Sequence, residues 1–151
     1  MRRTFARVLT TAIVLTAVAG AQQKPDFSGR WVVVSPPEGA GHEQVVTQDA
    51  KTLTAELLSE GGGHKMTYQL DGLEHRNAIP SRGAEIVMTS TANWDGDRLV
   101  INTRTVYPNG PKTSAKEVWS MDAQGRLIVD YTEAGPTGPG PAMKVIYTRK
   151  K

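Results

Sequence analysis

The sequence predicts an all-β fold, an antiparallel up-and-down meander barrel of about 8–10 strands. Turn signals rich in Gly, Pro, Asn and Asp recur at short, regular intervals between residues 30 and 149. The runs between them are about 6–10 residues long and rich in Val, Ile, Thr and Tyr, which favours strands. Apolar and charged side chains alternate within these runs, as in a sheet with one dry face.

Ten strands are expected, at residues 30–35, 43–49, 52–58, 64–70, 73–79, 84–94, 98–107, 113–121, 126–133 and 142–149. Only residues 50–58 have helical character, and Thr52 and Thr54 argue against a helix there. The chain has no Cys, so no disulfide framework can form and stability must come from the core.

Three turns predict how neighbouring strands pair. Tight loops at Asp71-Gly72 and Asp95-Gly96, together with a three-residue loop that ends at Gly125, each place the apolar residues of their two strands on one face. The expected pairs are Leu70 with Leu73, Tyr68 with His75, Trp94 with Asp97, Ala92 with Leu99, Ser90 with Ile101, Met88 with Thr103, Met121 with Leu127, Trp119 with Val129 and Glu117 with Tyr131.

The turn at Asn109-Gly110 does not resolve in the same way. A two-residue loop there would pair Tyr107 with Lys112 and turn Val118, instead of Trp119, toward the core. A bulge next to Pro111 would restore the pattern, so the register stays open at this point.

The strand alternation predicts which side chains line the barrel. The expected inner set is Trp31, Val33, Leu53, Leu57, Met66, Tyr68, Leu70, Leu73, His75, Ile86, Met88, Leu99, Ile101, Trp119, Leu127, Val129, Tyr131, Val145 and Tyr147. The opposite face carries charged residues such as Arg98, Arg104 and Lys116, which suits contact with water.

Several polar residues share this inner face. Aromatic walls with a few convergent polar groups are what a small-molecule site requires. The candidate ligand-binding residues are Tyr68, His75, Glu117, Trp119, Tyr131 and Tyr147. Two other interpretations stay open: Glu117, Glu133 and Arg149 could lie at a wet rim, and the tyrosines could simply fill the core.

The first 21 residues have the features of a signal peptide. A basic start with Arg2, Arg3 and Arg7 precedes an uncharged apolar run too short to span a bilayer, and Ala19-Gly20-Ala21 suits cleavage. We therefore expect residues 22–151 to form a single periplasmic or secreted domain without a stable membrane anchor. The pair Arg2-Arg3 leaves both the general secretory and the twin-arginine route open.

Cleavage would also change the charge of the protein. Three of its 18 Lys and Arg residues leave with the signal, so 15 remain against 15 Asp and Glu. The sequence pI of about 9.3 thus mostly reflects the signal. Because the remaining chain lacks a basic stripe, we expect no nucleic-acid partner. The oligomeric state is not indicated.

The segment Phe27-Ser28-Gly29-Arg30-Trp31 resembles the first strand of the lipocalin-like, or calycin-type, β-barrels, which opens with Gly-x-Trp. Residues 94–101 further resemble a pattern of small exported bacterial lipocalin-like proteins that form an uncharacterised subgroup. The resemblance implies that Trp31, after Gly29, closes one barrel end and packs against a basic residue of the last strand, for which Arg149 is suitably placed. An indole face and a guanidinium attract one another.

Motifs for catalysis or for a cofactor are not found. His42, His64 and His75 lack metal-ligand spacing, and we expect no metal and no cofactor. The sequence favours an exported, non-enzymatic protein that binds a small, partly apolar ligand inside the barrel. One alternative is a cell-envelope interaction or inhibitor module with a solid core, which would use the loops around residues 108–111 and 135–141. Another is a hydrolase that uses Glu117 and Glu133.

Overall fold

The computed structural model describes residues 24–59, 63–81, 84–108, 110 and 112–151, most of which are in β-strands. The elements are β1 (Gly29–Ser35), the short 3-10 helix η1 (Pro37–Gly39), β2 (Glu43–Gln48), β3 (Thr52–Leu58), β4 (His64–Gln69), β5 (His75–Ser81), β6 (Ala84–Asp95), β7 (Arg98–Val106), β8 (Lys112–Met121), β9 (Leu127–Gly135), β10 (Gly138–Pro139) and β11 (Met143–Arg149). Each of the ten expected strands is present, and the two-residue β10 is an addition. The predicted signal peptide lies outside the described residues.

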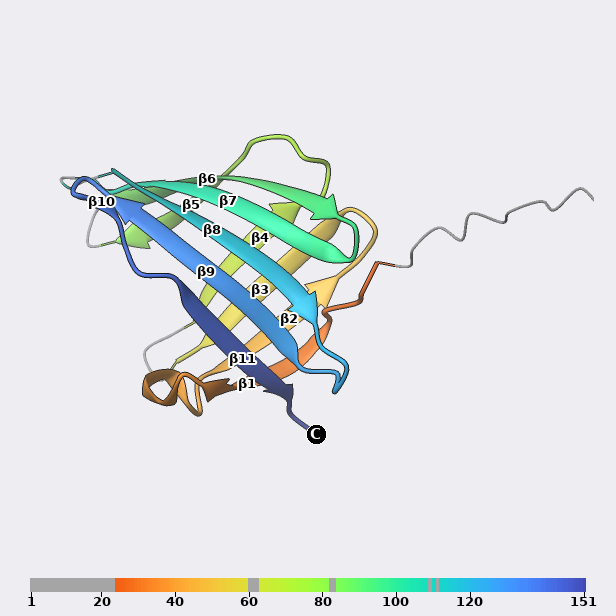
Figure 1. Ribbon diagram of the computed structural model, residues 1–151. Coiled ribbons are helices and arrows are strands. Elements are labelled where there is room, and N and C mark those ends of the chain that lie inside the picture. Colours follow the sequence, from red (N-terminus) through yellow and green to blue (C-terminus); the bar gives the residue numbers. More distant parts are fainter. Residues whose placement is uncertain (1–23, 60–62, 82–83, 109, 111) are drawn as a thin grey trace, which may run out of the picture.

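The strands form one antiparallel sheet in the order β4-β3-β2-β1-β11-β9-β8-β7-β6-β5. Long strands that follow one another along the chain pair with each other, except β4 and β5, and β1 also pairs with β11. The sheet curls until its two edges, β4 and β5, face each other across a seam (Figure 1). Among the described residues one side-chain hydrogen bond crosses this seam, from Asn77 Nδ2 to the carbonyl oxygen of Thr67 at 3.0 Å. The predicted meander barrel is therefore confirmed and nearly closed.

The hairpin at Gln124-Gly125 has the predicted register. Trp119 lies opposite Val129, Glu117 lies opposite Tyr131, and Gly125 has the left-handed φ of 73° that its loop requires. The register between β7 and β8 is also resolved, because Val106 pairs with Lys112. An odd number of residues then separates the strands, so Trp119 pairs with Leu99 on the inner face.

The predicted register at Asp95-Gly96 is wrong by two residues. The loop residues are Gly96 and Asp97, so Asp95 pairs with Arg98 and Trp94 pairs with Leu99. An ion pair of 2.5 Å between the Arg98 and Asp95 side chains spans this turn. Because a shift of two keeps the alternation of faces, the inward residues of both strands are unchanged.

The predicted hairpin at Asp71-Gly72 is wrong, since β4 and β5 form no ladder. Asp71 Oδ1 accepts the backbone N–H of Leu73 at 2.9 Å, which makes a local turn that carries the chain across the seam. The predicted pairing of Tyr68 with His75 therefore does not occur. Leu73, expected inside, is 65% exposed.

The inner face changes character along the barrel. Its fully buried side chains gather at the end where residues 24–28 enter, and they include Phe27, Trp31, Leu53, Leu99 and Leu127. Toward the other end several inward residues are exposed, as at Met143 of β11 and Leu57 of β3, although Thr105 of β7 stays buried. The barrel thus has a dry end and an open end, the latter beside η1 and β10 in Figure 1.

The outer face of the sheet carries paired charges. Arg76 contacts Glu85 at 3.1 Å, and Arg104 contacts Glu74 at 2.5 Å. All four of these side chains are more than half exposed, so each pair contributes little to stability. In the described part of the chain no helix is both long and apolar enough to cross a membrane.

Candidate functional site

The dry end is closed by three residues of the Gly-x-Trp segment and the last strand. Trp31 pairs with Arg149 across β1 and β11, and the guanidinium carbon lies 4.5 Å from the centre of the indole ring. Arg149 Nη1 also donates to the carbonyl oxygen of Ser28 at 2.6 Å. Gly29 has a φ of 147°, and a Cβ there would lie 2.5 Å from Arg149 Nη1. These contacts bring Gly29, Trp31 and Arg149 together at this end and engage the Arg149 guanidinium.

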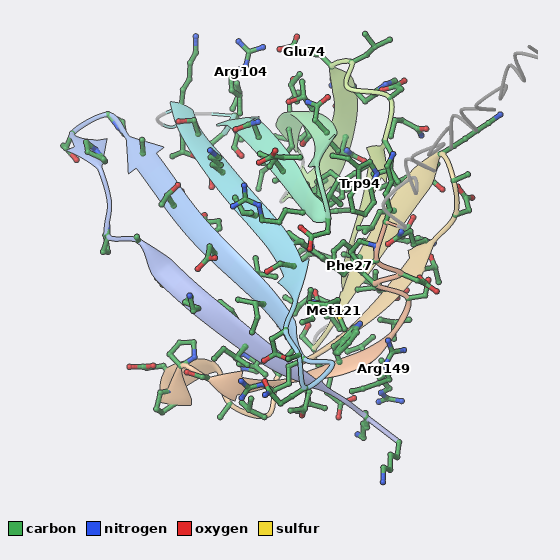
Figure 2. The ribbon with its side chains drawn as sticks, turned by 45° about the vertical axis from the view of Figure 1, so that its right-hand side comes forward. Phe27, Glu74, Trp94, Arg104, Met121 and Arg149 are labelled. Carbon is green, nitrogen blue, oxygen red and sulfur yellow. The ribbon has the colours of Figure 1, made fainter. Side chains whose placement is uncertain are left out.

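Phe27 seals the same end from the inside. Its ring stacks on Trp94 at 5.9 Å and meets Trp119 edge-on at 5.8 Å, while its carbonyl oxygen accepts the Trp31 indole N–H at 2.8 Å. Figure 2 shows Phe27 and Trp94 together between the walls of the barrel. The sequence indicated Phe27 only as part of a motif, because residue 27 precedes the first strand and no alternation reaches it.

Glu117 lies farther along the inner face, between Ile101 of β7 and Tyr131 of β9. Its Oε2 accepts the indole N–H of Trp119, two residues along the same strand, at 2.7 Å. In the described part of the chain no basic side chain forms an ion pair with it. The carboxyl group is thus enclosed, yet its residue stays partly accessible to solvent.

Three tyrosines from three strands surround this carboxyl group. Tyr68 of β4 is buried, whereas Tyr131 of β9 and Tyr147 of β11 are partly exposed. Glu117 lies close enough to all three for its charge to act on their hydroxyls. Trp119, which is buried, completes the aromatic surroundings. Five of the six predicted ligand-binding residues are therefore brought together inside the barrel.

The acidities of these groups reflect their burial. Loss of solvation raises the pKa of the Glu117 carboxyl group, and the hydrogen bond from Trp119 opposes this only in part. Burial, followed by the nearby Glu117 charge, also raises the pKa of Tyr68 and raises that of Tyr147 to about 12. Burial and Glu133 raise the pKa of Tyr131 to about 12. The tyrosines therefore stay protonated at neutral pH.

Several inward polar atoms have no partner. Glu117 Oε1 and the hydroxyls of Tyr68 and Tyr147 form no hydrogen bond with the described residues, yet none of them is sealed from solvent. Space for a probe the size of water therefore reaches these atoms. They supply both donors and acceptors beside apolar walls, which is a lining that can hold a small amphipathic molecule.

His75 and Glu133 lie away from this group. His75 is at the start of β5, where Nε2 lies 3.0 Å from both carboxylate oxygens of Asp71. Glu133 is one pair further along the hairpin than Glu117, on the same face, but it is exposed. It accepts the Tyr131 hydroxyl at 3.2 Å. The two glutamates thus occupy different environments, one enclosed and one at the rim.

Gln44 is an inward polar residue that the sequence did not reveal. It pairs with Trp31 and Leu57 and is 7% exposed, and its Nε2 is sealed from solvent without a hydrogen-bond partner. Such an unsatisfied donor costs free energy in the empty protein. Because Val45 and Val46 are adjacent, the sequence pattern cannot say which face of β2 is buried. The alternation of Gln44 with Val46 becomes informative only once the pairing with β1 is known.

Metal ligands do not gather in the described residues, where no group of three His, Asp or Glu side chains could hold an ion. A scan against protein-family models and a search of curated proteins each find no match to this chain. The barrel itself is a nearly closed antiparallel meander that is compatible with a lipocalin-like fold.

Proposed function

We propose that this chain is an exported, non-enzymatic protein of the lipocalin-like kind that binds a small, partly apolar molecule inside its barrel. The observation that carries the proposal is the set of inward, unpartnered and accessible polar atoms on Glu117, Tyr68 and Tyr147. In the empty protein only water can pair with these inward atoms, and a ligand group that reproduces the hydrogen bonds of such water can displace it. A ligand would supply the missing partners.

The gradient of burial supports the same function. One end is sealed by Phe27, Trp31 and Arg149, whereas inward residues at the other end keep contact with solvent. A container with one closed and one open end lets a ligand enter without unfolding the barrel. Recognition would then rest on burial of apolar surface and a few hydrogen bonds, with no bond-making step.

The hydrolase alternative needs two carboxyl groups that flank one bond. Only Glu117 is enclosed, and Glu133 is an exposed acceptor for Tyr131. The unequal placement of these two residues favours binding over hydrolysis.

The first experiment is native mass spectrometry of residues 22–151 purified from the periplasm, together with titration of N-phenyl-1-naphthylamine, an apolar fluorescent probe that is uncharged at neutral pH. We expect a co-purified small molecule or saturable probe binding. Ala115→Trp should weaken probe binding by about tenfold or more, since Ala115 faces inward next to Glu117 on β8 and a larger ring would occupy the interior.

The matched control is Lys144→Trp, which adds the same ring on the outer face of β11. This variant should bind the probe like the unmodified protein. Both variants must show the circular dichroism spectrum of the parent protein. Equal binding by both variants, or no bound molecule and no probe binding, would reject the container and favour the interaction module with a solid core.

A further inference from the structure

We propose that the barrel interior selects an organic cation, a small molecule with an ammonium group on an apolar or aromatic body, and that Glu117 is its counter-ion. This inference rests on the proposed function, because it names the chemical class of the ligand for the same interior. It follows from the charge and the aromatic content of the walls.

Two carboxyl groups face the interior from the described strands. Glu117 is the enclosed acid, and Glu133 adds a second acid at the rim. The inward basic residues of the described strands are Arg149, which is engaged by Trp31 and Ser28, and the imidazoles of His64 and His75 near strand ends. An anionic ligand would therefore meet a carboxyl group and no available guanidinium or ammonium.

The Glu117 carboxyl group has one hydrogen-bond partner among the described residues. Oε2 is held by the Trp119 indole N–H at 2.7 Å, which fixes the orientation of the group, while Oε1 is unpartnered and accessible. An enclosed carboxylate without a cation is costly, and removal of its solvation already raises its pKa. A ligand ammonium would provide both the missing donor and the missing charge.

Aromatic rings from four strands lie near the Glu117 carboxyl group. Tyr68, Tyr131, Tyr147 and Trp119 come from β4, β9, β11 and β8, so they approach Glu117 from several walls. Aromatic faces attract cations, and cages of such rings are a recurring way to recognise ammonium groups.

The test compares three probes of similar size by isothermal titration calorimetry on residues 22–151. They are 2-phenylethylamine, its neutral counterpart 2-phenylethanol, and the anion 3-phenylpropanoate. We expect the amine to bind with a Kd at least about tenfold lower than the alcohol, and the anion to bind most weakly. Glu117→Gln should abolish the preference for the amine and retain binding of the alcohol.

The control is Glu133→Gln, which removes a carboxylate from the rim and should leave the preference intact. Equal affinity for amine and alcohol in the unmodified protein, or a preference that survives Glu117→Gln, overturns the inference. If the alcohol or N-phenyl-1-naphthylamine binds and Ala115→Trp blocks it, but no amine preference exists, the container function stands and only the cation inference fails. If none of the probes binds and no small molecule co-purifies with the protein, both fail. The comparison in the unmodified protein decides the matter even if a variant does not fold.

Discussion

At the scale of single residues, Glu117 is the acid whose pKa is raised, among the described acids that have a resolved pKa shift. Asp49, Asp71 and Asp122 have lowered pKa values, chiefly because backbone N–H groups stabilise their charged forms. Glu117 has a raised pKa because burial removes solvation and only Trp119 compensates. The fold therefore disfavours ionised Glu117, as expected of a group that a ligand completes.

This difference predicts an unusual dependence of stability on pH. A carboxyl group with a raised folded pKa binds more protons in the folded state, so its stabilising effect is complete below the unfolded pKa, near 4.5, and is lost as pH rises through the folded pKa. The slope is about 1.4 kcal/mol per pH unit within that window. We expect the free energy of unfolding of Glu117→Gln, relative to the parent protein, to rise above about pH 4.5. Urea unfolding at several pH values measures this.

The parent protein must be compared with the variant because other acids have lowered pKa values. Their contribution to the free energy of unfolding changes with pH in the opposite direction, since it is lost as pH falls. Subtracting the two proteins removes that common background. A difference that stays constant from pH 4 to pH 8 (about the range where single-domain stability usually peaks) would mean that Glu117 is well solvated.

A second prediction at the residue scale concerns the stability of a Gly29 variant. Gly29→Ala should lower the free energy of unfolding by about 1–3 kcal/mol, because the positive φ strains any other residue and the new Cβ would displace the Arg149 guanidinium. The control is Gly135→Ala, where no atom lies within 4 Å of the added Cβ and φ is not positive. Equal losses in urea unfolding for both variants would show that the contact of Arg149 with Gly29 and Trp31 does not hold this end.

At the scale of strands and turns, the sequence predicted the strand registers that the chemistry of a single turn fixes. Gly125 marks a loop whose geometry fixes the register of β8 and β9, so the inward directions of Glu117, Trp119 and Tyr131 could be predicted. The error at Asp95-Gly96 did no harm, because a slip of two residues keeps the same faces.

Other features depend on contacts that local chemistry does not encode. An Asp-Gly turn has the same sequence whether the strands beside it pair or lie at opposite edges of a sheet, so the place of His75 beside Asp71 could not be foreseen. The inward direction of Gln44 depends on the pairing of β1 with β2 across a long connection. The sequence pattern therefore could not predict that Gln44 faces inward or that His75 lies beside Asp71.

We expect the barrel to open locally at the seam between β4 and β5. Asn77→Ala removes the one described side-chain hydrogen bond that joins the two edges, from Asn77 to the carbonyl oxygen of Thr67. We expect faster hydrogen exchange at amides of β4 and β5 and a loss of about 1 kcal/mol in unfolding free energy. Asn102→Ala, on the outer face of β7, is the control and should leave exchange at the seam unchanged. Unaltered exchange in Asn77→Ala would mean that packing alone closes the barrel.

At the scale of the whole molecule, the fully buried side chains gather toward one end of the barrel, and the proposed binding residues adjoin them, since Tyr68 pairs with Leu53 and Tyr147 pairs with Leu127. The dry end gathers Phe27, Trp31, Leu53, Leu99 and Leu127, which are fully buried. The rest of the interior carries Glu117 and partly exposed tyrosines, which contribute less apolar burial. A small barrel without disulfides can leave part of its interior open only if the sealed part supplies most of the core.

This division predicts that the same kind of truncation has unequal effects at the two ends. Phe27→Ala should lower the free energy of unfolding by about 3–5 kcal/mol, because it removes a fully buried ring that contacts Trp94 and Trp119. Met143→Ala, at an inward position of β11 that is 46% exposed, should cost below about 1 kcal/mol. Urea unfolding followed by tryptophan fluorescence measures both. Similar losses for the two variants would mean that the core extends through the open end, which would leave no room there for a ligand.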